Sequence, residues 1–125
     1  MAIARILVPI DFTPASDAAL SYALAVAEET GADVEVLYVW QPSSLFADSP
    51  EGVAMEKRLS AAEVEHRTCR VCGRLEFGDE ADQVILAILE REQFDLVVMG
   101  EDAGERHIAE NVAKTSPCKV VLKAA

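Results

Sequence analysis

Residues 5–20 read RILVPIDFTPASDAAL, and this stretch decides the fold class. Residues 5–10 form an almost continuous apolar run of strand length, as expected for a parallel strand that is buried on both faces. Thr13 is a good helix N-cap, and Pro14 suits the first helical position because its missing N–H would have no partner there. A buried strand that turns directly into a helix is typical of a βαβ unit.

The rest of the chain repeats this alternation. The first helix has one apolar stripe and ends at Gly31, where a left-handed residue is favoured. Further strands are predicted at residues 34–40, about 69–77, 95–99 and 118–122, and further helices at about 50–67, from 81 onward and after 104. The turn at Gly78-Asp79 is predicted to cap the third helix. Strict alternation favours a mainly parallel sheet with helices on both faces. We therefore predict one α/β domain over residues 1–125.

Composition narrows the classes of function. The chain has 125 residues, 51% of them hydrophobic and 26% charged, which is typical of a globular domain. Its formal charge of -11 argues against nucleic acid and anionic membrane as partners. No apolar run is long enough to span a bilayer, and the first residues do not resemble a secretory signal. Three cysteines do not make a disulfide framework. These features predict a cytoplasmic protein.

Polar residues and glycines follow two of the predicted strands. Pro9, Asp11 and Thr13 stand at the tip of the first strand, and Gly100 and Gly104 follow the fourth. Parallel sheets bind ligands beyond the carboxyl ends of their strands, so a carboxylate here would accept from a ribose hydroxyl or an adenine amino group. Backbone N–H groups after the fourth strand would hold phosphate. In the alternative interpretation, Asp11 only caps the first turn and the two glycines only permit tight bends.

Four stretches resemble the universal stress proteins. They are ILVPIDFTPAS at residues 6–16, GDEA at 78–81, FDLVVMG at 94–100 and SPCKVVL at 116–122. The resemblance covers nearly the whole chain and implies a doubly wound, Rossmann-like sheet of five parallel strands in the order 3-2-1-4-5, as in the adenine-nucleotide alpha hydrolases. It also implies a role in stress tolerance and signalling. A homodimer joined through the fifth strands is implied as well, with some support from the apolar residues Val120, Val121 and Leu122.

One branch of this family binds ATP and another does not. By resemblance, Asp11 matches the aspartate of the ATP branch, Val39 lies near the backbone that faces adenine, and Gly100 matches the first glycine of the phosphate loop. The rest of that loop does not match. Gly104 comes after three intervening residues instead of two, the long spacer is missing, and Arg106-His107 stand where a Gly-Ser/Thr pair is expected.

The turn after Gly100 is also acidic, since it carries Glu101, Asp102 and Glu105. Two like charges ~4 Å apart repel by roughly 4 kcal/mol at the effective dielectric near a protein surface. A turn this short cannot wrap a triphosphate in backbone N–H groups. It predicts that ATP is not held through the family's glycine loop, although a monophosphate or small anion fits at the helix start.

Other residues with reactive side chains give weaker signals. Cys69 and Cys72 spell C-x2-C, but no second pair follows, and residues three apart on a strand point to opposite faces. We interpret them as structural thiols and predict no metal site. His107 has no nucleophile beside it, which favours an exposed residue at a helix start over a general base. Trp40 suits two roles equally well, stacking on a base or covering the end of the sheet or a partner.

The sequence therefore predicts a dimeric binding or signalling module of the stress response, with protein partners and no catalytic activity. The alternative is an adenine-nucleotide sensor that binds AMP or ATP in the crevice between the first and fourth strands. Its candidate site residues are Pro9, Asp11, Val39, Gly100, Gly104, Arg106 and His107.

Overall fold

The computed structural model describes residues 3–40, 50–65, 70–78, 80–101 and 106–124. Strands and helices alternate along the chain as the sequence predicts. In order they are β1 (Arg5–Pro9), α1 (Pro14–Thr30), β2 (Asp33–Trp40), α2 (Pro50–Glu65), β3 (Val71–Phe77), α3 (Ala81–Arg91), β4 (Leu96–Gly100), α4 (Arg106–Thr115) and β5 (Lys119–Lys123).

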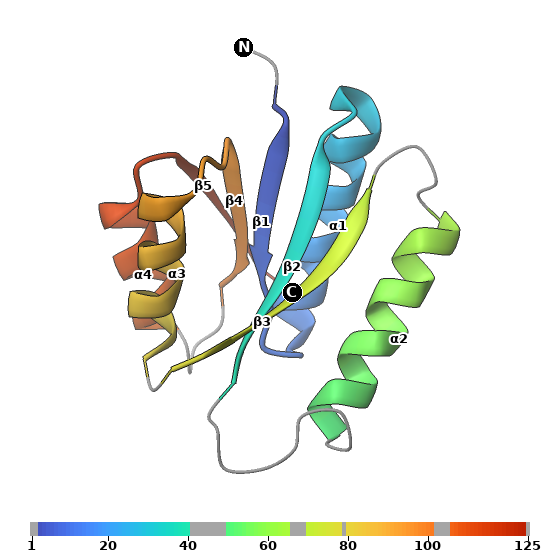
Figure 1. Cartoon of the computed structure of the whole chain (residues 1–125), viewed down its shortest axis with the longest axis horizontal. Coiled ribbons are helices and arrows are strands. Elements are labelled where there is room, and N and C mark those ends of the chain that lie inside the picture. Colours follow the sequence, from blue (N-terminus) through green and yellow to red (C-terminus); the bar gives the residue numbers. More distant parts are fainter. Residues whose placement is uncertain (1–2, 41–49, 66–69, 79, 102–105, 125) are drawn as a thin grey trace.

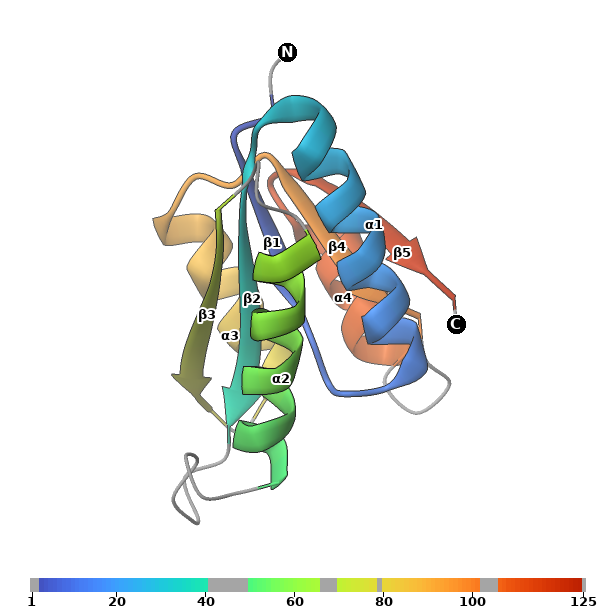
Figure 2. The same ribbon diagram turned by 90° about the vertical axis from the view of Figure 1, so that its right-hand side faces the viewer.

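The strands form one parallel sheet in the order β3-β2-β1-β4-β5, which confirms the predicted order. β1 lies at the centre, where Ile6 is the register partner of Val34 on one side and of Leu96 on the other. Helices α1 and α2 cover one face of the sheet, and α3 and α4 cover the opposite face (Figures 1 and 2). From β1 the sheet extends through β2 to β3 on one side and through β4 to β5 on the other. The direction in which the chain winds therefore reverses between β1 and β4.

Alternate residues of the central strands divide the core into two layers. Ile6 and Val8 pack toward α1 and α2, whereas Leu7 packs toward α3 and α4. The apolar stripe predicted for α1, which includes Leu20 and Leu24, is buried in the first layer. The local signals of this helix are also confirmed, because the side chain of Thr13 accepts from the N–H of Ser16 and Gly31 has the left-handed φ of 75°.

Several predicted boundaries differ from the structure by one or two residues; β4, for example, spans 96–100 rather than 95–99, and β5 spans 119–123 rather than 118–122. The third strand begins at Val71 rather than near 69, because its neighbour β2 begins at Asp33 and pairs Val34 with Val71. Cys69 lies outside the described residues, as does the predicted cap residue Asp79. The N-cap position of α3 belongs to Glu80, which has extended backbone and whose side chain makes no capping bond.

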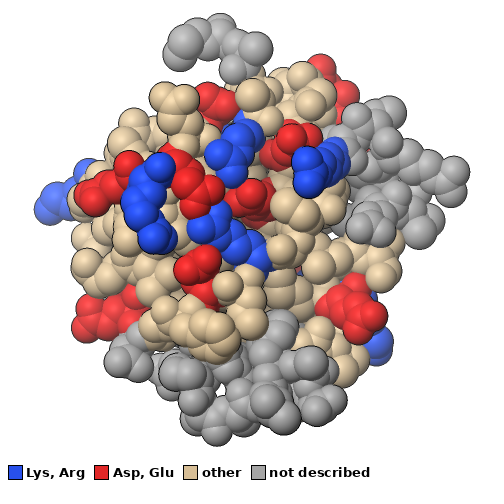
Figure 3. Space-filling model, in the orientation of Figure 1, with Lys and Arg blue, Asp and Glu red and all other residues tan. Residues whose placement is uncertain are grey.

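An ion-pair cluster covers part of the α3/α4 face of the sheet, and we define it as Arg5, Glu35, Arg74, Glu76 and Glu92. Arg74 binds Glu92 through two nitrogens, at 2.6 and 2.9 Å, and its Nε donates to Glu76 at 3.1 Å. Arg5 lies between Glu35 and Glu92, with its Nη2 atom 3.1 Å from Glu35 Oε1 and 3.4 Å from Glu92 Oε1. The hydrogen bonds from Arg74, followed by the weaker effects of Arg5, lower the pKa of Glu92. Figure 3 shows basic and acidic side chains interleaved on the visible face.

Among the described residues, no helix combines the length and the apolar character needed to cross a lipid bilayer.

Candidate functional site

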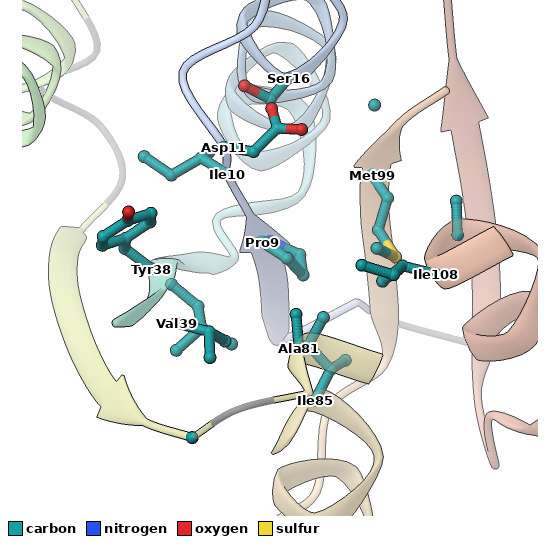
Figure 4. A pocket seen from close by; sticks show the side chains of 14 residues that line it. Pro9, Ile10, Asp11, Ser16, Tyr38, Val39, Ala81, Ile85, Met99 and Ile108 are labelled. Carbon is teal, nitrogen blue, oxygen red and sulfur yellow. The ribbon is translucent and has the colours of Figure 1, made fainter. Parts of the chain in front are cut away.

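A pocket of about 420 Å³ opens at the carboxyl ends of β1, β2 and β4. Pro9 and Asp11 come from the end of β1 and the turn after it, Val39 from β2 and Gly100 from β4. The first turns of α3 and α4 contribute Ala81 and Ile108 (Figure 4). The volume lies within the range of about 300–1,000 Å³ that small-molecule sites occupy, and the position is the reversal point of the sheet.

Four of the predicted site residues meet in this pocket, namely Pro9, Asp11, Val39 and Gly100. They come from the ends of β1, β2 and β4 and from the turn after β1, which the sheet order brings together although they are far apart in the sequence. Gly104 lies outside the described residues. Arg106 and His107 form the start of α4, and their side chains also lie outside what the structure describes.

Asp11 takes part in a capping arrangement and also faces the pocket. Its Oδ1 accepts from the Thr13 N–H at 3.1 Å and from the Thr13 hydroxyl, while Thr13 Oγ1 accepts from the Ser16 N–H at 3.3 Å. Asp11 is nevertheless exposed and lines the pocket (Figure 4). The two interpretations of Asp11 are therefore compatible, since one carboxylate oxygen serves the turn and the other remains an acceptor for a ligand.

Gly100 is required by packing, whatever the pocket binds. A Cβ added to this residue would lie 2.5 Å from the backbone nitrogen of Ser16 and 2.6 Å from the carbonyl carbon of Ala15. The first turn of α1 thus rests directly against the end of β4. The tight-bend interpretation was incomplete, because a close approach between two backbones explains the glycine.

Most of the side chains that line the pocket are apolar. The apolar lining side chains include Tyr38, Val39, Ile85, Met99 and Ile108. Among the lining residues that the structure describes, Asp11 is the one acidic residue and none is basic. The N-termini of α3 and α4 also point toward this edge, where their backbone N–H groups favour partial negative charge. Apolar side chains with one carboxylate suit a flat ring that carries hydroxyl or amino donors, whereas the helix N-termini suit an acceptor or an anionic group attached to that ring.

The connection from β4 to α4 is short. β4 ends at Gly100 and α4 begins at Arg106, so only residues 101–105 separate the two elements. Glu101 is exposed, and its N–H donates to the carbonyl of Lys123 on β5. Residues 102–105 lie outside the described residues.

Sequence reasoning missed several lining residues, including Tyr38, Ala81, Ile85 and Ile108. Their positions carried a usable signal, because each lies at the end of a predicted strand or in the first turns of a predicted helix. Ser16 was also missed. It is 2% exposed, and its hydroxyl donates to the carbonyl of Thr13 at 3.0 Å.

The remaining chemical candidates show no shared site. Cys72 is half-buried on β3, where burial, followed by the charge of Glu35, raises the pKa of its thiol. Cys118 contacts the hydroxyl of Ser116 at 3.5 Å. Cys69, His66 and the Trp40 side chain lie outside the described part of the chain. Within that part, no three His, Cys, Asp or Glu residues are grouped so as to hold a metal ion.

Comparison with solved structures finds the same fold in several proteins. The chain is similar to the universal stress protein UspA from Lactobacillus plantarum, with a TM-score of 0.81 and 21% identity over 98% of this chain and 99% of that one. It is also similar to a universal stress protein in complex with cAMP, with a TM-score of 0.75 and 17% identity over 99% and 98% of the two chains. A universal stress protein from Archaeoglobus fulgidus in complex with dAMP is also similar, with a TM-score of 0.71 and 20% identity over 98% of this chain and 99% of that one.

At these identities the structural matches establish the fold alone. A sequence comparison with curated proteins finds no match. The model of the universal stress protein family, however, matches residues 2–122, which is almost the whole length. Together with the sheet order and the pocket at its reversal point, this match identifies the chain as a member of the universal stress protein family.

Proposed function

We propose that the chain is a non-catalytic binding module of the stress response whose pocket accepts the adenosine part of a nucleotide, with AMP or a similar ligand preferred to ATP. The observation that carries this proposal is the pocket at the ends of β1, β2 and β4, with its apolar side chains and the single carboxylate of Asp11. The apolar side chains suit a purine ring, and Asp11 suits its hydroxyl or amino donors. The relatives in complex with cAMP and dAMP support a ligand of this size.

The turn after β4 argues against a triphosphate. Residues 101–105 provide few backbone N–H groups before α4 begins, and three of the five residues are acidic. Acidic side chains beside the phosphates weaken binding in proportion to the number of phosphate charges. In the proposal Gly100, Gly104, Arg106 and His107 therefore hold at most one phosphate, at the start of α4.

The proposal does not include catalysis. The hydroxyl of Ser16 lines the pocket, but it donates to the carbonyl of Thr13, which cannot act as a base. A binding module of this kind acts through partners, and we place it in the cytoplasm as one domain over residues 1–125.

Thermal unfolding with AMP, ADP and ATP, each with magnesium, tests the ligand. A ligand at ten times its dissociation constant raises the free energy of unfolding by about 1.4 kcal/mol. We expect AMP to raise the melting temperature more than ATP does at equal concentration. A larger shift with ATP would contradict the proposal, and no shift with any nucleotide would leave a module that works through protein partners alone.

Asp11→Ala serves as the matched variant in this measurement. A hydrogen bond to a charged group contributes about 1.5 kcal/mol or more, so the affinity for AMP should fall at least about tenfold. Asp33→Ala, which removes an exposed carboxylate at the opposite end of the sheet, should leave the affinity unchanged. Equal affinities in the two variants would remove Asp11 from the site.

We also propose a homodimer formed by antiparallel pairing of β5. This strand is an edge of the sheet, and its residues Val120, Val121 and Leu122 remain half-buried in the single chain. An apolar edge strand tends to pair with another strand. Light scattering at micromolar concentration should give twice the mass of 13.5 kDa. A monomer under these conditions would contradict the prediction.

A further inference from the structure

The residue next to Asp11 has an unusual backbone. Phe12 has a φ of 63°, and among the described residues it is the only non-glycine residue with positive φ. A bulky side chain disfavours this left-handed conformation, which persists where the surroundings hold it in place. The strain lies one residue from the carboxylate that faces the pocket, so the contacts that maintain it bear on the site.

Two side chains outside this turn hold the Phe12 ring. On one side lies Tyr38, with the ring centroids 4.8 Å apart and the planes tilted by 47°. The guanidinium carbon of Arg58 lies 5.1 Å from the centroid of the Phe12 ring. Arg58 belongs to α2, so the ring is held jointly by β2 and a helix that contributes no lining residue to the pocket.

Arg58 is itself fixed in place. Its Nε and Nη2 donate to the two carboxylate oxygens of Asp17 on α1, at 2.6 and 3.1 Å. Its Nη1 donates to the carbonyl of Ala54 at 3.2 Å. A guanidinium bound by two parallel hydrogen bonds has little freedom to rotate, so it presents a defined surface to the aromatic ring.

The conformation of Phe12 determines where the Asp11 carboxylate lies. Asp11 Oδ1 accepts from the N–H and the hydroxyl of Thr13, so both bonds span Phe12. If Phe12 relaxed to a negative φ, Thr13 would turn relative to Asp11 and these bonds would lengthen or break. The carboxylate would then lose its fixed direction at the pocket.

We propose that Arg58 is a positioning residue for the pocket. By holding Phe12 in its left-handed conformation, it keeps the Asp11 carboxylate directed at the ligand, and it thereby links the placement of α2 to ligand affinity. The ligand part of this inference rests on the proposed function, whereas the positioning of Asp11 does not.

The test compares Arg58→Met with Arg74→Met. Both variants exchange a half-buried arginine for an apolar side chain of similar length, but Arg74 belongs to the ion-pair cluster and does not line the pocket. A cation–π contact of about 0.5–1 kcal/mol corresponds to a change of about two- to fivefold. Arg58→Met should weaken AMP binding by this factor, and Arg74→Met should leave it unchanged.

Hydrogen exchange of the Thr13 amide in the protein without ligand gives a second readout. This N–H donates to Asp11, so in Arg58→Met its exchange should accelerate by about two- to fivefold through local opening. In Arg74→Met the exchange of the Thr13 amide should accelerate only to the extent that global unfolding becomes more frequent. If wild-type protein bound no nucleotide, the proposed function would fail, and the exchange of Thr13 would still decide whether Arg58 positions Asp11.

Phe12→Gly shows whether Arg58 acts through the ring. Glycine adopts a φ near 63° without strain and has no ring to hold. In this background Arg58→Met should change neither AMP affinity nor Thr13 exchange. The proposal is overturned if Arg58→Met leaves Thr13 exchange unchanged in the wild-type background, or if its effect persists in full with Phe12→Gly.

Discussion

Replacing Gly100 with alanine is expected to lower the free energy of unfolding by about 3 kcal/mol, at the upper end of the range for overpacked sites. The added methyl group would lie within 2.6 Å of backbone atoms of Ala15 and Ser16. Backbone atoms cannot turn aside as the end of a side chain can, so β4 and the first turn of α1 must separate. Urea denaturation of the wild-type and variant proteins measures the loss.

Gly73→Ala is the matched control for this substitution. Its Cβ would meet a methyl group of Leu59 at 2.6 Å and the end of Met55 at 3.2 Å, both of which belong to flexible side chains on α2. We expect Gly73→Ala to cost about 1 kcal/mol, the low end of the same range. Equal losses in the two variants would show that the approach of α1 to β4 is not rigid.

Arg74→Met is expected to lower the free energy of unfolding by about 2 kcal/mol at pH 7. The substitution leaves Glu92, Glu76 and Glu35 without their common partner on a half-buried face of the sheet. Removing one partner of a fully buried pair costs about 3–5 kcal/mol. The carboxylates here are 20–31% exposed, so solvent screening reduces the loss.

The same variant should respond less to acid than the wild type does. Arg74 lowers the pKa of Glu92 below its ordinary value of 4.5, so this pair stabilises the fold fully above that value. Its contribution is lost as the pH falls through the lowered pKa of the folded state. The stability difference between wild type and Arg74→Met should therefore shrink between pH 7 and pH 3. A difference that stays constant over this interval would contradict the assigned cause.

Local signals in the sequence were enough to predict the element order. Thr13 and Gly31 mark the ends of α1 through their own backbone and side-chain chemistry, and the stripe along the helix follows from its 3.6-residue period. The order of the strands came from the family resemblance, because periodicity alone does not say which strands are neighbours. The predicted start of the third strand, near residue 69, differs from Val71 for the same reason, since the start of the neighbouring strand β2 limits the pairing of β3.

The candidate site was predictable where it depends on strand ends and unpredictable where it depends on contacts across the fold. Asp11 and Gly100 follow apolar runs in the sequence, so their meeting at one edge could be anticipated. The reason for a glycine at position 100 could not be anticipated, because that reason is the close approach of the α1 backbone. The left-handed turn at Phe12 and the contribution of Arg58 likewise depend on tertiary packing, which no local pattern records.

The central position of β1 has a consequence for synthesis on the ribosome. Leu7 and Leu37 emerge early, yet their partners in the second core layer, such as Ile88 and Val112, belong to α3 and α4. The α1/α2 layer can begin to close around Ile6 and Val34 while the opposite face of the nascent sheet remains bare. The second neighbour of β1 is β4, which begins only at residue 96. Such long-range pairing slows folding, and the bare face is where a chaperone would be expected to bind the growing chain.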